Sequence, residues 1–176
     1  MKVCVDPGLG GNDPGAIARK PIFTEEKEVN LKIALLLEGE LLAKGCQVLM
    51  TRRVDRALSL NARADFANRH QADLFVSIHV NAAESESAEG MEVFSFPGSV
   101  KGQQIAHAVL RSMLATCPGH KDRGVKEANF AVLRLTAMPA VLVECEFMTN
   151  PQQLIFLAEP ANQREIAMAI GGGIVG

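Results

Sequence analysis

The segment Asp73–Ala82 constrains the fold more than any other part of the sequence. It opens with Leu74–Ile78, a short apolar run rich in β-branched and aromatic residues, which is typical of a buried strand in a mostly parallel sheet. His79 and Asn81 follow where the apolar pattern fades. Because ligands of open α/β sheets bind outside the carboxyl ends of the strands, His79 stands where a metal ligand or proton carrier is expected. A purely structural, hydrogen-bonded histidine stays open at this point.

Strands and helices are expected to alternate along the chain. Further strands are predicted at 2–5, 47–51, 91–96, 130–134 and 140–144. Helices are predicted at 24–44 (with Thr24 as N-cap), 60–68, 99–116, from 150 onward, and 161–170, whereas 118–124 is expected to be a loop. This alternation without a linker or repeat predicts one three-layer α/β domain over residues 1–176, with a mostly parallel, twisted sheet of about six strands flanked by helices.

Charge and cysteine usage exclude several classes of protein. The net charge of −2 argues against a nucleic-acid binder, which usually carries a basic face. The four cysteines are scattered without a CxxC pair, so we expect buried thiols and no disulfide framework. No apolar run is long enough to span a bilayer, and no signal peptide is recognisable at the start of the chain as given. We expect a monomer with no nucleic-acid or membrane partner.

A loop rich in glycine and proline, Asp6–Gly15, follows the first strand. Such a loop invites a nucleotide-binding interpretation, which needs either GxxxxGK[ST] or GxGxxG. Asp13 stands where the third glycine of the second pattern should be. The sequence therefore disfavours nucleotide binding.

Four features are expected to meet at one edge of the sheet: the Asp6–Gly15 loop, Glu26 at the start of a helix, His79, and Glu144 at the end of a buried strand. Zinc hydrolases use three protein ligands drawn from His and Glu, with water in the fourth position. A nearby unligated carboxylate then moves the proton. Glu26 and His79 are sensible ligands and Glu144 a sensible base, but no spacing rule alone selects them, and Glu26 also suits the helix dipole.

Ordered motifs along nearly the whole chain resemble the zinc-dependent N-acetylmuramoyl-L-alanine amidases, the amidase type 3 family of cell-wall hydrolases. The motifs are VDPGLGGNDPGA, EKEVNLKIA, TRRVD, SLNARADFAN, LFVSIHVNA, DRGVKEANFAVLR and MPAVLVECEFMTNP. The resemblance implies a peptidoglycan hydrolase, either an autolysin or an endolysin, that acts on the cell wall in the periplasm or outside the cell. It implies cleavage of the amide between N-acetylmuramic acid and L-alanine of the stem peptide by zinc-activated water. It also implies Glu26 and His79 as zinc ligands and Glu144 as the catalytic acid/base, and leaves the substrate-binding residues unknown.

One position departs from the family pattern. The family reads DPGHGG where this chain has DPGLGG, so Leu9 replaces the first histidine ligand. Leucine binds no metal, and the loss of even an outer-shell partner typically costs about 10–100-fold in metal affinity, so we expect zinc to be weakly bound or absent. The chain is then an inactivated variant, a non-catalytic peptidoglycan-binding pseudo-enzyme, or an enzyme that recruits another ligand. Asp6 and Asp13 are the nearest candidates for recruitment.

A cysteine hydrolase built on Cys145 and His79 is a third alternative. Successive strand residues face opposite ways, so only one of Glu144 and Cys145 points into the cleft, which disfavours it. The remaining polar residues are expected to have structural or surface roles: Arg63 and Arg123 as ion partners, Asn81 as a brace of the strand end, and His70, His107 and His120 as ordinary surface histidines.

Overall fold

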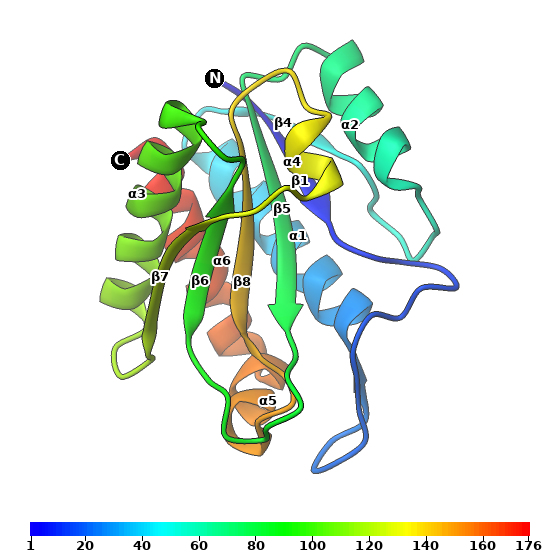
Figure 1. Ribbon diagram of the computed structural model, residues 1–176, viewed down its shortest axis with the longest axis vertical. Coiled ribbons are helices and arrows are strands. Elements are labelled where there is room, and N and C mark those ends of the chain that lie inside the picture. Colours follow the sequence, from blue (N-terminus) through cyan, green and yellow to red (C-terminus); the bar gives the residue numbers. More distant parts are fainter.

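A computed structural model describes all 176 residues of the protein (Figure 1). Its centre is a six-stranded sheet in the order β4–β1–β5–β8–β6–β7. The strands are β1 (Lys2–Pro7), β4 (Gln47–Met50), β5 (Leu74–Asn81), β6 (Met91–Ser95), β7 (Asp122–Glu127) and β8 (Ala140–Phe147). Strands β4, β1, β5 and β8 are parallel, β6 is antiparallel to β8, and β7 is parallel to β6. The predicted α/β fold with a mostly parallel sheet is confirmed.

Helices cover the two faces of the sheet unequally (Figure 1). The long helices α1 (Glu26–Ala43), α3 (Val100–Thr116) and α6 (Pro160–Val175) pack against one face, and α5 (Pro151–Ala158) joins α6 to the end of β8. On the other face, α2 (Leu60–Arg69) and the short α4 (Ala131–Arg134) cover one part only. A small hairpin, β2 (Ile17–Ala18) and β3 (Thr24–Glu25), precedes α1. No helix combines the length and the apolar character needed to cross a membrane.

The alternation of side chains along each strand separates two kinds of surface. The face under α1, α3 and α6 belongs to a core of 31 buried residues, whose strand members include Val3, Val5, Val76, Ile78, Val141 and Val143. The opposite face has a core of only eight residues, near α2 and α4. The strand positions on that second face beyond this small core are polar: Asp6, Ser77, His79, Asn81, Glu92 and Glu144. The polar chemistry of the chain therefore gathers on one side of the sheet.

Two predicted elements differ in type or boundary. Residues 130–134 were predicted as a strand, but Ala131–Arg134 forms α4 with Phe130 as its N-cap, which buries Val132 and Leu133 against the sheet. A short apolar run does not by itself distinguish a strand from a buried helix. The first helix begins at Glu26, and Thr24 lies in β3, so Thr24 is not the N-cap.

Two other segments extend beyond their predicted limits. Residues 118–124 were predicted as a loop, but β7 already begins at Asp122. β7 is an edge strand without a fully buried residue, so its sequence lacks the alternation of apolar and polar residues that marks a strand. The last helix does not end at 170 but continues through three glycines to Val175. Gly173 lies against α3 so closely that a Cβ there would stand 2.5 Å from Val109 Cα. These glycines therefore serve helix packing rather than termination.

Candidate active site

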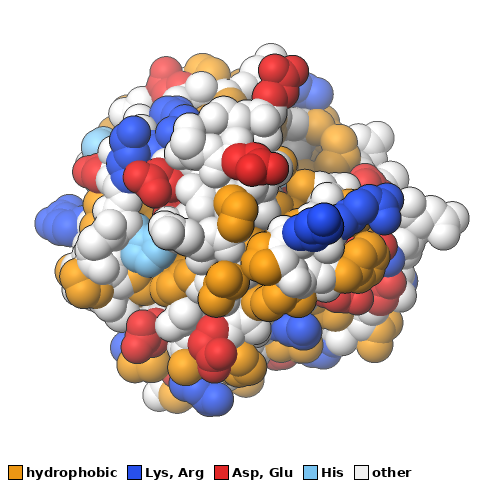
Figure 2. Space-filling model, turned by 90° about the horizontal axis from the view of Figure 1, so that it is seen from below, with side chains coloured by type: hydrophobic (Ala, Val, Ile, Leu, Met, Phe, Trp, Pro, Cys, Tyr) orange, Lys and Arg blue, Asp and Glu red, His pale blue; other side chains and the backbone are white.

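A cavity of about 490 Å³ opens on the polar face of the sheet, next to the carboxyl ends of the parallel strands. Figure 2 views the molecule from the end at which β5 finishes. Asp6, His79 and Glu144 contribute polar side chains to the wall of the cavity. Its apolar lining comes from the loop after β1, the start of α2, β8 and α4: Leu9, Leu58, Leu60, Phe130, Ala131, Val132 and Leu142. This combination of an apolar concave wall and a few convergent polar groups is typical of a ligand site.

Glu26 and His79 are in direct contact. His79 Nδ1 lies 2.9 Å from Glu26 Oε1, although the two residues are 53 positions apart. Glu26 also accepts hydrogen bonds from Asn30 Nδ2 at 3.2 Å and from the Ala16 amide at 3.1 Å. Burial acts against ionisation of Glu26, but the hydrogen bond and charge of His79 outweigh it, so the pKa of this carboxyl lies below its usual value. The same pairing raises the pKa of His79 against the opposing effect of its burial.

Glu144 lies beside His79 because the two residues are register partners in the parallel pair β5–β8. Glu144 Oε2 is buried and has no hydrogen-bond partner. Burial raises the pKa of Glu144 to about 8, with further upward contributions from the charges of Glu26 and Glu92 and a downward one from His79. The carboxyl is therefore largely protonated at neutral pH and has an oxygen free to meet a ligand.

The loop after β1 fits closely around these groups. A Cβ on Gly8 would stand only 2.2 Å from His79 Nε2, so a glycine is needed for the imidazole to lie there. Leu9 adopts φ +63°, a conformation uncommon for residues other than glycine and one in which Asn, Asp and His are enriched. The Leu9 side chain and the Glu26 carboxylate both approach Gly15, at 2.1 and 2.5 Å from the point where its Cβ would stand. Leu9 thus places a methyl group beside the predicted metal ligand.

The donor set does not fit a catalytic zinc ion. Such an ion takes three protein ligands, whereas no three His, Cys, Asp or Glu residues of the structure are arranged to hold a metal. Recruitment of Asp6 is ruled out, because its oxygens accept from Arg63 at 2.7 Å, Thr51 at 2.5 Å and Ser77 at 2.9 Å. Asp13 lines the cavity but is exposed, and it accepts a hydrogen bond from the Gly15 amide. No other side chain takes the place of the histidine that the family resemblance implies at position 9.

The structural roles predicted for the arginines and Asn81 are confirmed. Arg63 forms a buried ion pair with Asp6, and Arg123 pairs with Glu92. Asn81 Nδ2 donates to Glu92 Oε1 at 2.7 Å, which ties the end of β5 to β6 across the intervening strand.

His120 is not a surface histidine. Its Nδ1 lies 2.9 Å from Glu146 Oε1, its side chain is only 12% exposed, and its ring packs on Phe156. No local sequence pattern links His120 to a carboxylate 26 residues away. His70 and His107 are exposed as predicted.

Cys145 is fully buried in the core on the opposite face of the sheet, and all four cysteines are free and buried. Burial raises the pKa of the Cys145 thiol far above its usual value. A buried, protonated thiol turned away from the cavity is no nucleophile, so the cysteine-hydrolase alternative is wrong.

The family Amidase_3, described as N-acetylmuramoyl-L-alanine amidase, matches residues 3–175. The chain belongs to this family. Among its curated relatives, amidase LytC of Bacillus subtilis is 38% identical over 98% of this chain. Amidase CwlM of Bacillus licheniformis is 36% identical over 99% of it. The chain spans 34% of the length of LytC and 67% of that of CwlM.

Solved amidase structures share the whole fold. Amidase AmiC2 of Nostoc punctiforme superposes with a TM-score of 0.93 at 35% identity, covering 99% of this chain and 95% of that one. An N-acetylmuramoyl-L-alanine amidase from Clostridium difficile 630 gives a TM-score of 0.94 at 37% identity, covering 99% and 94%. The fold of this chain therefore extends over nearly the whole of these solved amidase chains.

Proposed function

We propose that this domain hydrolyses the amide between N-acetylmuramic acid and L-alanine of the peptidoglycan stem peptide, with Glu144 as the proton carrier. The observation that carries the proposal is the unpartnered oxygen of Glu144, which lies beside His79 in the wall of a cavity large enough for a ligand. Membership of the amidase family supports the choice of bond. The domain then acts at the cell wall, outside the cytoplasm.

The chemistry assigned to Glu144 follows from its protonation state. Water adds to the carbonyl carbon of the amide, and the C–N bond breaks as the proton of the Glu144 carboxyl passes to the leaving nitrogen. The proton lost by the water then restores the carboxyl. A group whose pKa lies near the working pH is suited to both transfers, and the pKa of about 8 for Glu144 meets that condition.

Leu9 limits this activity. A zinc ion would activate the water and polarise the carbonyl at neutral pH, but here only Glu26 and His79 remain of the implied ligands. We propose that zinc is weakly held and that hydrolysis is slow compared with that of relatives with a complete ligand set.

A non-catalytic peptidoglycan-binding domain is the second candidate. It is favoured by Leu9 itself, since the side chain joins an apolar cavity wall and leaves the cavity intact as a binding site. In that case Glu144 serves only as a hydrogen-bond donor to the bound glycopeptide.

Incubation with purified peptidoglycan separates the candidates. Amide hydrolysis exposes new N-terminal L-alanine, which amine labelling and chromatography quantify, and co-sedimentation with the insoluble wall measures binding. Release of L-alanine termini by the protein but not by the Glu144→Gln variant supports the hydrolase. Sedimentation without release supports the binding domain. Failure of the protein both to sediment and to release termini contradicts both candidates.

A further inference from the structure

A second buried carboxylate, Glu92, lies directly beside Glu144 on the polar face of the sheet. The two are register partners in the antiparallel pair β6–β8. The Glu92 side chain is 5% exposed and accepts hydrogen bonds from Asn81, from Arg123 Nε at 2.9 Å and from Lys126 Nζ. Glu92 thus fixes two cations of β7 next to the candidate active site.

The positive charge of Arg123 and Lys126 exceeds the negative charge of Glu92. Arg123 and Lys126 carry two positive charges against one carboxylate, and their side chains remain 30% and 39% exposed. Lys126 Nζ makes no hydrogen bond except to Glu92, and the second guanidinium nitrogen of Arg123, Nη2, makes none. One cation would neutralise Glu92, so the pair leaves a net positive charge and free donors at the surface.

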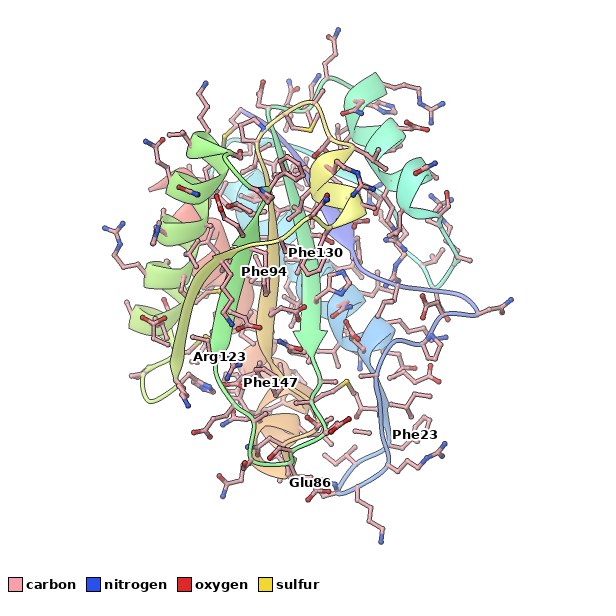
Figure 3. All side chains as sticks on the ribbon, viewed as in Figure 1. Phe23, Glu86, Phe94, Arg123, Phe130 and Phe147 are labelled. Atoms are coloured by element: carbon pink, nitrogen blue, oxygen red, sulfur yellow. The ribbon has the colours of Figure 1, made fainter.

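The positive site formed by Arg123 and Lys126 adjoins the wall of the cavity. Phe130 lines the cavity and packs edge-on against Phe94, with ring centroids 5.2 Å apart. Lys126 Nζ stands 5.8 Å from the centroid of Phe94. Figure 3 shows Phe130, Phe94 and Arg123 following one another down the same side of the sheet. A ligand seated at Glu144 can therefore follow this surface to the cations.

The spacing of the strands sets how far along a substrate the cations would act. β7 lies two strands away from β8, which is about 10 Å at the usual strand spacing. An extended peptide covers roughly 3.3–3.6 Å per residue, so about 10 Å corresponds to the second or third residue from the bond at Glu144.

We propose that Arg123 and Lys126, held by Glu92, form a subsite for a carboxylate on the second or third residue of the stem peptide. The inference rests on the proposed function, because it uses the position of the scissile amide at Glu144. Arginine offers a planar fork of donors that matches a carboxylate, and lysine adds a compact charge. Because Glu92 already holds both side chains in place, less freedom is lost when the ligand binds.

The subsite is tested by binding, which does not depend on turnover. Calorimetry compares synthetic muramoyl-tripeptides that carry a free carboxylate or a carboxamide on the second and third residues. We expect the carboxylate form to bind about tenfold more tightly, as charge-assisted hydrogen bonds allow. The preference should weaken as salt is added.

The matched variants are Lys126→Met, which keeps the aliphatic stem over Phe94, and Lys32→Met, which removes an exposed lysine of α1 on the other side of the sheet. The first should abolish the preference and the second should keep it. If Lys126→Met does not fold, Arg123→Gln replaces it in the same comparison. Equal binding of the two peptides by the unmodified protein overturns the subsite and leaves the proposed function standing. Failure to bind any muramoyl peptide overturns the proposed function and the subsite together.

Discussion

Asp6 and Glu144 are two carboxylates on the same face of the same sheet, separated by one strand, and their surroundings differ completely. Asp6 is fully buried and accepts hydrogen bonds from Arg63, Thr51 and Ser77. Glu144 forms no salt bridge, the charge of the neighbouring His79 offsets only part of the effect of burial on its pKa, and its Oε2 has no hydrogen-bond partner. Both residues line the same cavity.

The difference separates a carboxylate that stabilises the fold from one that is available for chemistry. Asp6 joins β1, the end of β4, β5 and α2 through its three donors. The charge of a buried carboxylate is tolerated when it is paired and hydrogen-bonded. Without such partners burial favours the protonated form, and it raises the pKa of Glu144. An unsatisfied buried group of this kind marks a functional position.

The largest expected effect is on catalysis, from Glu144→Gln. A positioned acid–base group typically contributes about 10²–10⁴-fold, so release of L-alanine termini from peptidoglycan should fall by at least 100-fold, as measured by amine labelling. The free energy of unfolding should not fall, because no hydrogen bond to Oε2 is lost. Glu165→Gln, at an exposed site on α6, is the control. Equal activity of Glu144→Gln and the control would remove Glu144 from the mechanism.

At Asp6 the expected effect is on stability rather than on catalysis. Arg63→Ala leaves the buried Asp6 carboxylate without its cation, and breaking a buried pair in this way costs about 3–5 kcal/mol. Urea denaturation measures that loss. Arg69→Ala, on the exposed side of the same helix, should change the free energy of unfolding by less than about 0.5 kcal/mol. If Arg63→Ala is as stable as the unmodified protein, Asp6 does not stabilise the fold in the way that distinguishes it from Glu144.

A smaller effect is expected from Leu9→His, which places a histidine at the predicted ligand position beside Glu26. Histidine suits φ +63° better than leucine does, and a third ligand should raise zinc affinity by more than about 100-fold, since even an outer-shell partner is worth about 10–100-fold. Calorimetric zinc titration and the activity assay measure the gain. Leu9→Ala, which removes the leucine without adding a donor, is the control. No gain over Leu9→Ala would contradict the assignment of Glu26 and His79 as ligands.

A further effect is expected on the pH dependence of stability. The folded-state pKa of Glu144, about 8, lies above the ordinary value of 4.5, so its contribution is fully present below about pH 4.5 and is lost as the pH rises through 8. His79, whose pKa is also raised, loses its contribution at rising pH as well, whereas Glu26, whose pKa is lowered, loses its contribution at falling pH. Between pH 5 and 8, the free energy of unfolding of the wild type should therefore fall relative to that of Glu144→Gln. A constant difference would mean that Glu144 ionises normally.

The sequence predicted the central strands of the sheet well, because apolar runs such as Leu74–Ile78 and Val141–Val143 are typical of buried strands. It failed where that signal is absent or fits a buried helix equally well. β7 is an edge strand without fully buried residues, and the apolar run 130–134 packs as a helical turn instead of a strand.

Less of the candidate active site than of the fold could be predicted from the sequence. Glu26 and His79 were selected by family resemblance, and their contact depends on a helix start meeting a strand end 53 residues away. The departure at Leu9 from the family pattern was visible in the sequence, but only the structure shows that Asp6 is engaged by Arg63 and Thr51 and that no three possible metal ligands lie together. The surplus charge around Glu92 depends on strand order, which no local pattern encodes.

The titration of Glu144 itself tests the contrast with Asp6 most directly. Carboxyl carbon shifts of 13C-labelled glutamate, assigned by comparison with the Glu144→Gln variant, report the pKa of this one group. A resonance that titrates near pH 8 is the predicted result. A midpoint near 4.5 would show that the carboxyl is an ordinary ionised group, and the account of Glu144 as the proton carrier would be wrong.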